Sequence, residues 1–392
     1  MSLYLDHAAT TPLRPEARRA LESWRDAANA SAAHADGRHA RTAVEQAREQ
    51  VAAAIGCTPH EIVFTSGGTE ADNLAVKGVV WAAAGRGVVP HVVTTAVEHA
   101  AVIEPLRWLA SRGEIALTVV EAASDGRVDP ERLVDAVRPD TVLVAVMAAN
   151  NEIGAINDVA SIATALADHP CVVHTDAVQM VATRNLDVAT LGIDTMALSA
   201  HKFGGPQGVG VAYLRRGVPV VPLLHGGGQD RGVRSGTFAA GLIAACGAGL
   251  AAAEADRAAL AARLEGFSDR MTQALTVLEG VTRTGPSATE HRLASHVHLL
   301  LEDVTSEALS LGLDSVGIAA SGGAACGSGA AKPSHVLTAI GAHGTPLRLT
   351  TGWTTTAADI ERAIDVLVDL LPRLRTSAAG VGGGLMNLAP VS

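Results

Sequence analysis

The sequence predicts an α/β protein in which a large domain with a mostly parallel mixed sheet, flanked by helices, is joined to a smaller α+β domain. Three observations lead to this fold class. Short β-branched runs alternate with amphipathic segments between residues 61 and 215, as in parallel sheets covered on both faces. A long helical pattern rich in Ala, Leu, Arg and Glu follows. A second, smaller set of strand and helix patterns then reaches about residue 374.

The elements are expected in the following order. Residues 13–55 have a helical, polar-faced pattern with Pro15 near its start, and a further helix is expected to begin near Thr69. The strand patterns share a high content of β-branched residues, and they are residues 61–65, 91–95, 141–146, 171–175 and 210–214. Because such sheets bind ligands at the carboxyl ends of their strands, residues just after these runs are the first candidates for a site.

The domain boundary is expected inside the long helical pattern, near residue 255. The large domain would be residues 13–255, and the small domain would combine residues 1–12 with 256–375. The apolar run 238–253 is 16 residues long and rich in Ala and Gly, which indicates a buried helix rather than a membrane span. Residues 376–392 contain four glycines and no periodic pattern, so we expect a flexible carboxyl-terminal tail.

Charge and cysteine content narrow the function. With 30 basic and 40 acidic residues the net charge is −10, which disfavours direct binding of nucleic acid or of an anionic membrane surface. The four cysteines are at least 75 residues apart in sequence, without zinc-site spacing, so we expect neither a metal site nor a disulfide framework. The amino terminus lacks a signal-peptide pattern, and a cytoplasmic location is expected.

Three segments carry candidate binding and catalytic groups, each with an ordinary structural alternative. TSGGTE at residues 65–70 could bind a phosphate at a helix amino terminus, or it could simply start a helix. Lys202, one of three lysines, lies between an apolar run and a glycine-rich loop, where an amine could form a Schiff base; a solvated loop lysine is the alternative. Asp176 ends an apolar strand and could pair with a protonated ring nitrogen or cap a helix.

Cys326 is the candidate reactive thiol. It lies in a run of Ala, Gly and Ser residues from 319 to 331 that can bury little surface, so the loop is expected to move. A free thiol is only a few per cent ionised at neutral pH, so the site or the substrate must help to deprotonate it.

Several motifs in order resemble the pyridoxal-phosphate-dependent cysteine desulfurases of the class V aminotransferase family, of the type that supplies sulfur for iron–sulfur clusters. They are YLDHAATTP at 4–12, FTSGGTE at 64–70, VEH at 97–99, NNEIG at 150–154, DAVQ at 176–179, SAHK at 199–202, HGGGQDRGVRSGT at 225–237 and the Cys326 loop. The resemblance covers the chain up to about residue 374. It implies the pyridoxal-phosphate-dependent transferase fold of type I and a homodimer.

The resemblance also implies a role for each matching residue. Lys202 would hold pyridoxal 5'-phosphate as a Schiff base, Asp176 would pair with the pyridine nitrogen, and His99 would lie against the ring and handle protons. Gln179 would contact the ring oxygen. The phosphate would be held by Gly68, Thr69, Ser199, His201 and the partner subunit's Thr237. Asn151 and Arg348 would bind the substrate carboxylate, and Asn151 is also among the implied cofactor-binding residues.

The implied reaction converts L-cysteine to L-alanine and places the sulfur on Cys326 as a persulfide. An acceptor protein would then take the sulfur for iron–sulfur cluster assembly, tRNA thiolation or DNA phosphorothioation. A selenocysteine lyase and an aminotransferase are alternatives within the same fold. A non-catalytic scaffold is the alternative from another class of function.

Overall fold

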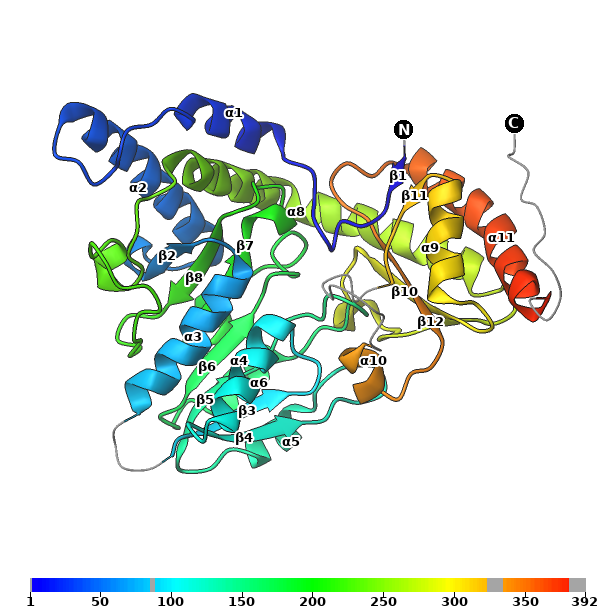
Figure 1. Cartoon of the computed structure of the whole chain (residues 1–392), viewed down its shortest axis with the longest axis horizontal. Helices are drawn as coiled ribbons and strands as arrows, with labels where there is room; N and C mark the ends of the chain where they lie inside the picture. The colour runs from blue at the N-terminus through cyan, green and yellow to red at the C-terminus, as the bar shows by residue number, and fades with distance from the viewer. Residues whose placement is uncertain (1, 85–88, 323–333, 381–392) are drawn as a thin grey trace.

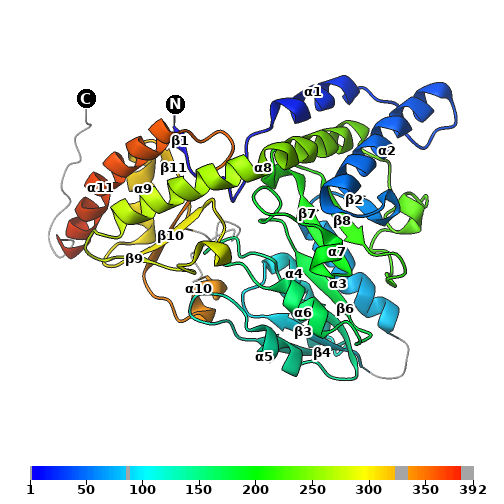
Figure 2. The same cartoon turned by 180° about the vertical axis from the view of Figure 1, so that it is seen from behind.

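The computed structural model describes residues 2–84, 89–322 and 334–380. Figures 1 and 2 show a large part and a smaller part, with the long helix α8 crossing from one to the other. The helices are α1 (Pro15–Trp24), α2 (Ala35–Ile55), α3 (Gly68–Ala83), α4 (Ala100–Ser111), α5 (Pro130–Asp135), α6 (Val159–Ala165), α7 (Val188–Leu191), α8 (Ala240–Leu275), α9 (Ser306–Ser315), α10 (His335–Ala339) and α11 (Ala357–Gly380). The strands are β1 (Leu3–Tyr4), β2 (Ile62–Thr65), β3 (His91–Thr95), β4 (Ala116–Val120), β5 (Thr141–Ala145), β6 (Val172–Asp176), β7 (Thr195–Ser199), β8 (Gly210–Leu214), β9 (Val281–Arg283), β10 (His296–Leu301), β11 (Ile318–Ala319) and β12 (Thr345–Thr350).

The large part is built on a seven-stranded sheet in the order β2-β8-β7-β6-β5-β3-β4. Strands β7, β6, β5, β3 and β4 pair in parallel, whereas β8 runs antiparallel to both of its neighbours. The predicted mostly parallel mixed sheet is therefore confirmed.

Both faces of this sheet are buried. Val92 and Val172 belong to an apolar cluster with residues of α3 and α4, whereas Val93 and Val173 belong to a second cluster with residues of α2, α6 and α8. Successive residues of a strand point to opposite faces, so a sheet covered on both sides needs the continuous apolar runs that the sequence shows.

Several predicted boundaries differ from the structure. The helical pattern 13–55 forms two helices, because the chain breaks after Trp24 and His34 caps α2 by accepting a hydrogen bond from the Gly37 amide at 3.2 Å. The sequence prediction lacked β4, a half-exposed edge strand, and β7, whose MAL core has no β-branched residue. Packing between β6 and β8 fixes β7 as a strand despite its helix-forming residues.

The small part contains the antiparallel sheet β12-β10-β9, the parallel pair β1-β11 and helices α9 and α11. Its apolar core includes Leu3 and Leu5 from the amino terminus, together with Met271 and Leu275 from the end of α8. Residues from the first half of α8, such as Leu250, belong instead to the core of the large part. A domain boundary near residue 255 stays a prediction.

The carboxyl-terminal helix is longer than expected. The tail was predicted to begin at residue 376, but α11 continues to Gly380, since the intervening alanines favour a helix. The remainder of the predicted tail, residues 381–392, lies outside the described residues. None of the helices in the described ranges combines the length and the apolar character needed to cross a bilayer.

Truncating Leu299 should destabilise the small part. Leu299 on β10 is fully buried, so Leu299→Ala should lower the free energy of unfolding by about 2–5 kcal/mol through lost burial and a cavity. The matched control is Leu311→Ala on α9, where the side chain is 72% exposed, and its effect should stay within about 0.5 kcal/mol. Urea unfolding followed by circular dichroism measures both. Equal midpoints for the two variants would contradict the assigned core.

Candidate active site

A cavity of about 570 Å³ lies where the carboxyl ends of strands β2, β3, β5, β6 and β7 meet the amino terminus of α3. Ten of the residues predicted from the sequence line it: Gly68, Thr69, His99, Asn151, Asp176, Gln179, Ser199, His201, Lys202 and Arg348. They come from segments up to 280 positions apart, from Gly68 to Arg348, and the sheet brings them together. This is the position at which parallel sheets bind ligands.

Two predicted residues are not among this lining. Thr237 is exposed and does not contribute to the cavity of its own chain. Cys326 lies outside the described residues, so its role stays a prediction.

Lys202 projects into the cavity from a short 3₁₀ turn, Ala200–Lys202, that directly follows β7. Its ammonium group donates hydrogen bonds to the carbonyl oxygens of Ala8 at 2.5 Å and Ala9 at 3.1 Å. The half-buried side chain is thus directed toward the amino-terminal segment rather than into bulk solvent. The segment 8–10 also lines the cavity, and the sequence prediction did not assign it to the site.

Asp176 is the last residue of β6 and is 6% exposed. One carboxylate oxygen accepts a hydrogen bond from the Val178 amide at 2.9 Å. Burial raises the pKa of Asp176, while the nearby His99 and Lys202 act in the opposite direction because positive charge favours the carboxylate. Asp176 is therefore a buried acid that faces two basic groups.

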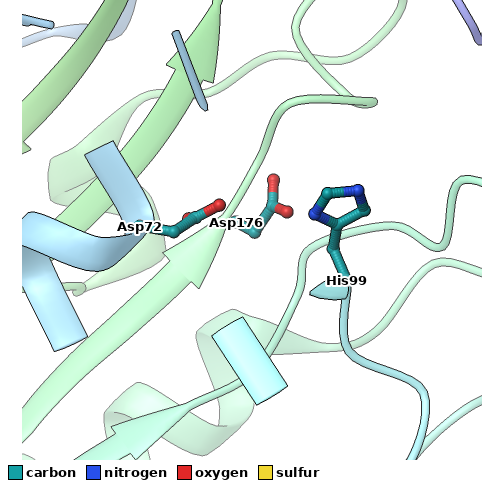
Figure 3. A group of neighbouring side chains, drawn as sticks. All are labelled: Asp72, His99 and Asp176. Carbon is teal, nitrogen blue, oxygen red and sulfur yellow. The ribbon is translucent and has the colours of Figure 1, made fainter. Parts of the chain in front are cut away.

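His99 lies beside this carboxylate, as Figure 3 shows. It caps α4: its Nδ1 accepts a hydrogen bond from the Ala101 amide at 3.1 Å. A nitrogen that accepts carries no proton, so in the neutral ring the proton resides on Nε2. One nitrogen of His99 and one oxygen each of Asp72 and Asp176 lie within 4.8 Å of one another.

The start of α3 has the features of a phosphate site. Unpaired backbone amides at a helix amino terminus attract anions, and here Gly68, Thr69, Ser199 and His201 surround that end. A side chain at Gly68 would bring its Cβ to 2.9 Å from a methyl of Val178, so a larger residue here would require Val178 to shift. Burial and then Lys202 lower the pKa of His201 to about 4, so its imidazole is neutral at physiological pH.

Arg348 on β12 is 2% exposed and reaches the cavity from the small part. Its guanidinium donates to the Asn151 carbonyl at 2.8 Å, to the Asp6 carboxylate at 2.8 Å and to the Ser321 hydroxyl at 2.9 Å. Three segments from different parts of the chain thus fix the plane of the Arg348 guanidinium. A guanidinium in a fixed plane can bind both oxygens of a carboxylate.

Sequence analysis missed three buried ionisable residues around this cavity. Asp72 lies on α3 and lines it, His174 lies on β6 two residues before Asp176, and Glu98 precedes His99. The signal for Asp72 was its place three positions after Thr69, on the helix face that turns toward the sheet. Its partner residues could not be inferred from the sequence, because they lie on other elements.

The set of groups suits a ligand that has an aldehyde, a basic ring nitrogen and a phosphate: an amine, a buried carboxylate and an anion-binding helix end share one cavity. Residues 3–363 match the family described as aminotransferase class-V. The chain belongs to this family. Its members depend on pyridoxal phosphate, and the residues present here fit that cofactor.

Individual relatives are similar over almost the whole chain. An IscS-like cysteine desulfurase from Mycobacterium tuberculosis is 41% identical, covering 97% of this chain and 99% of the relative. A solved structure named NifS-like protein superposes with a TM-score of 0.88 at 31% identity, covering 95% of this chain and all of the other. A structure of SspA in complex with cysteine has a TM-score of 0.78 at 30% identity, with 90% and 99% coverage. The predicted fold class and family are confirmed.

Replacing Glu98 should remove a pH dependence of stability. Its buried carboxyl accepts hydrogen bonds from the Thr95 hydroxyl at 2.7 Å and the Met147 amide at 2.8 Å, and burial raises its pKa to about 8. Between the ordinary glutamate pKa and about 8 the folded state therefore holds a proton that the unfolded state has lost. Stability contributed by this group falls as pH rises through that window, by at most about 1.4 kcal/mol per pH unit.

Glu98→Gln should consequently have a flatter profile of unfolding free energy between about pH 5 and pH 8 than the unsubstituted protein. Urea unfolding at several pH values measures it, with Glu104→Gln on the exposed surface of α4 as the control. Parallel profiles for the Glu98 variant and the unsubstituted protein would show that Glu98 is already ionised when folded.

Proposed function

We propose that this protein is a cysteine desulfurase that converts L-cysteine to L-alanine and passes the sulfur on as a persulfide. The observation that carries the proposal is the meeting of Lys202, Asp176, His99 and Arg348 in one cavity. Full-length similarity to a cysteine desulfurase supports the same activity.

The arrangement of the cavity supports the following cofactor-binding roles. Lys202 would hold pyridoxal 5'-phosphate covalently, Asp176 would face the ring nitrogen, and the start of α3 with Ser199 and His201 would hold the phosphate. Gln179, which lines the cavity and donates a hydrogen bond to the Ala8 carbonyl at 3.1 Å, would contact the ring oxygen. When bound, this cofactor supplies an electron sink that makes the Cα proton of an amino acid removable.

The chain then provides binding and proton transfer. Arg348 and Asn151 would orient the substrate carboxylate, and the amine of Lys202 would accept the Cα proton once it is free. His99, with its proton on Nε2, can donate a proton to a group held next to Asp176. The neutral imidazole of His201 leaves Lys202 without a second cation beside it, so the site does not rely on charge repulsion from His201 to deprotonate the amine.

Cys326 is proposed to receive the sulfur. Burial raises the pKa of Cys57 to about 12, of Cys171 to about 11 and of Cys246 to about 12, which makes the cysteines within the described residues poor nucleophiles. The thiolate of Cys326 would form an S–S bond with the substrate sulfur as the substrate C–S bond breaks. The carbon keeps the electron pair and takes up a proton, which gives alanine.

We further propose a homodimer in the cytoplasm that delivers sulfur to an acceptor protein. The exposed Thr237 follows a loop that is bound to α3 by a 2.8 Å ion pair between Arg234 and Glu70 at the rim of the cavity. A loop held there, with an exposed threonine that does not line its own cavity, is suited to complete the phosphate site of a second copy.

The function is tested by incubating the purified protein with L-cysteine and measuring its intact mass and the alanine formed. One added sulfur atom is expected on the unsubstituted protein and on Cys57→Ser, but not on Cys326→Ser, because the acceptor thiol is then absent. Alanine must appear in proportion to the sulfur gained. Persulfide on the Cys326 variant, or amino-group transfer to a keto acid without sulfur gain, would contradict the proposal.

Lys202→Ala should abolish the visible absorbance of the covalently bound cofactor and reduce turnover by at least about a thousandfold, since both the Schiff base and the base for the Cα proton are lost. Lys77→Ala is the matched control, because Lys77 lies farther along α3 with its ammonium 5.1 Å from the centre of the Trp108 ring. Absorbance spectra and alanine assays measure both. An unchanged spectrum for Lys202→Ala would remove the lysine assignment.

A further inference from the structure

Asp72 occupies a position that the proposed reaction does not use. It lies on α3 with 1% exposure, and its carboxyl oxygen is 3.2 Å from Nε2 of His174 on β6. Nδ1 of His174 lies 2.9 Å from the Thr195 hydroxyl on β7, and both of these residues are fully buried. Asp72, His174 and Thr195 therefore form a chain of hydrogen-bonding groups beneath the cavity floor.

The other side of Asp72 faces Asp176. Oxygen atoms of the two carboxyls and a nitrogen of His99 lie within 4.8 Å of one another, and Figure 3 shows the three side chains in line. Two carboxylates this close in a buried site repel strongly, because little water screens them. Such a pair relieves the repulsion by keeping one proton, so that one member is neutral and the other is anionic.

The contacts decide which acid keeps the proton. Asp176 accepts a hydrogen bond from the Val178 amide and lies near His99 and Lys202. All three groups favour its ionised form. For Asp72 the main influences act the other way: burial raises its pKa, and the negative charge of Asp176 raises it further. Its hydrogen-bond partner cannot neutralise it either, because burial lowers the pKa of His174 to about 4 and leaves that ring uncharged.

We propose that Asp72 is a positioning residue that keeps a proton as a neutral acid bonded to His174, and thereby leaves Asp176 as the single anion that faces the ring nitrogen of the cofactor. If Asp72 were ionised, the proton of the pair would reside on Asp176 instead. The pairing of Asp176 with that nitrogen would then be weaker. The protonation of Asp72 is argued from the fold alone, whereas the role of Asp72 in cofactor binding rests on the proposed function.

Infrared spectroscopy of the full-length protein with carbonyl-labelled aspartate tests the protonation directly. At neutral pH, one band of a protonated aspartic acid is expected before and after pyridoxal 5'-phosphate is removed. The band should disappear in Asp72→Asn and persist in Asp176→Asn. A band that survives in Asp72→Asn, or that vanishes in Asp176→Asn, would overturn the assignment. The label separates this signal from that of Glu98.

Cofactor affinity gives an independent measurement. Because Asn mimics a neutral acid, Asp72→Asn should bind pyridoxal 5'-phosphate within about threefold of the unsubstituted protein at neutral pH. Asp176→Asn should bind it about a hundredfold more weakly, since the charged partner is lost. A loss for Asp72→Asn as large as that for Asp176→Asn would overturn the assignment of Asp72 as the neutral acid.

A third variant keeps the proposal testable if Asp72→Asn does not fold. His174→Gln retains a neutral hydrogen-bonding partner, so the protonated-acid band should remain but shift in frequency; an unmoved band would refute the pairing of Asp72 with His174. If the cofactor does not bind at all, the proposed function fails while the band remains. A cofactor-loaded protein that lacks the band refutes the Asp72 assignment alone.

Discussion

The burial of ionisable groups at the carboxyl end of the central sheet is the constraint on which the site depends. Asp176 ends a strand whose preceding residues are packed on both faces, so its carboxylate has little contact with water. Placing a charge there without partners is costly, and the amide of Val178 with the basic groups of Lys202 and His99 offsets that cost. A cationic ring nitrogen would complete the same balance. The start of α3 attracts a negative group, whereas the buried acid attracts a positive one. A ligand that carries both a phosphate and a basic ring is therefore oriented between them.

The amino-terminal segment connects this charge arrangement to the small part. Ala8 and Ala9 accept hydrogen bonds from Lys202, and Asp6 pairs with Arg348. The two residues proposed to act on the cofactor and on the substrate carboxylate are thus held by neighbouring positions of one short stretch. A displacement of the small part relative to the sheet would move Arg348 and this stretch together, and so would alter the surroundings of the amine.

Much of this organisation could be predicted from the sequence. Asp176 was identified as the residue after a predicted strand, and Lys202 as one of three lysines, lying between an apolar run and a glycine-rich loop. Strand β7 escaped prediction, since its alanine and leucine favour a helix and only its neighbours impose an extended backbone. Asp72 and Glu98 were missed because their chemistry comes from burial and from residues far away in sequence.

The pairing of Asp6 with Arg348 has a consequence for biosynthesis. These residues are 342 positions apart, and β1 likewise waits for β11 before it can form its pair. At typical elongation rates the ribosome needs roughly twenty seconds to a minute to deliver that much chain. Throughout this interval Asp6 and β1 lack these partners, even though the strands of the central sheet have already emerged. Assembly of a competent enzyme is thereby postponed to the last stage of translation, and a prematurely terminated chain would lack the closure that holds the lysine in place.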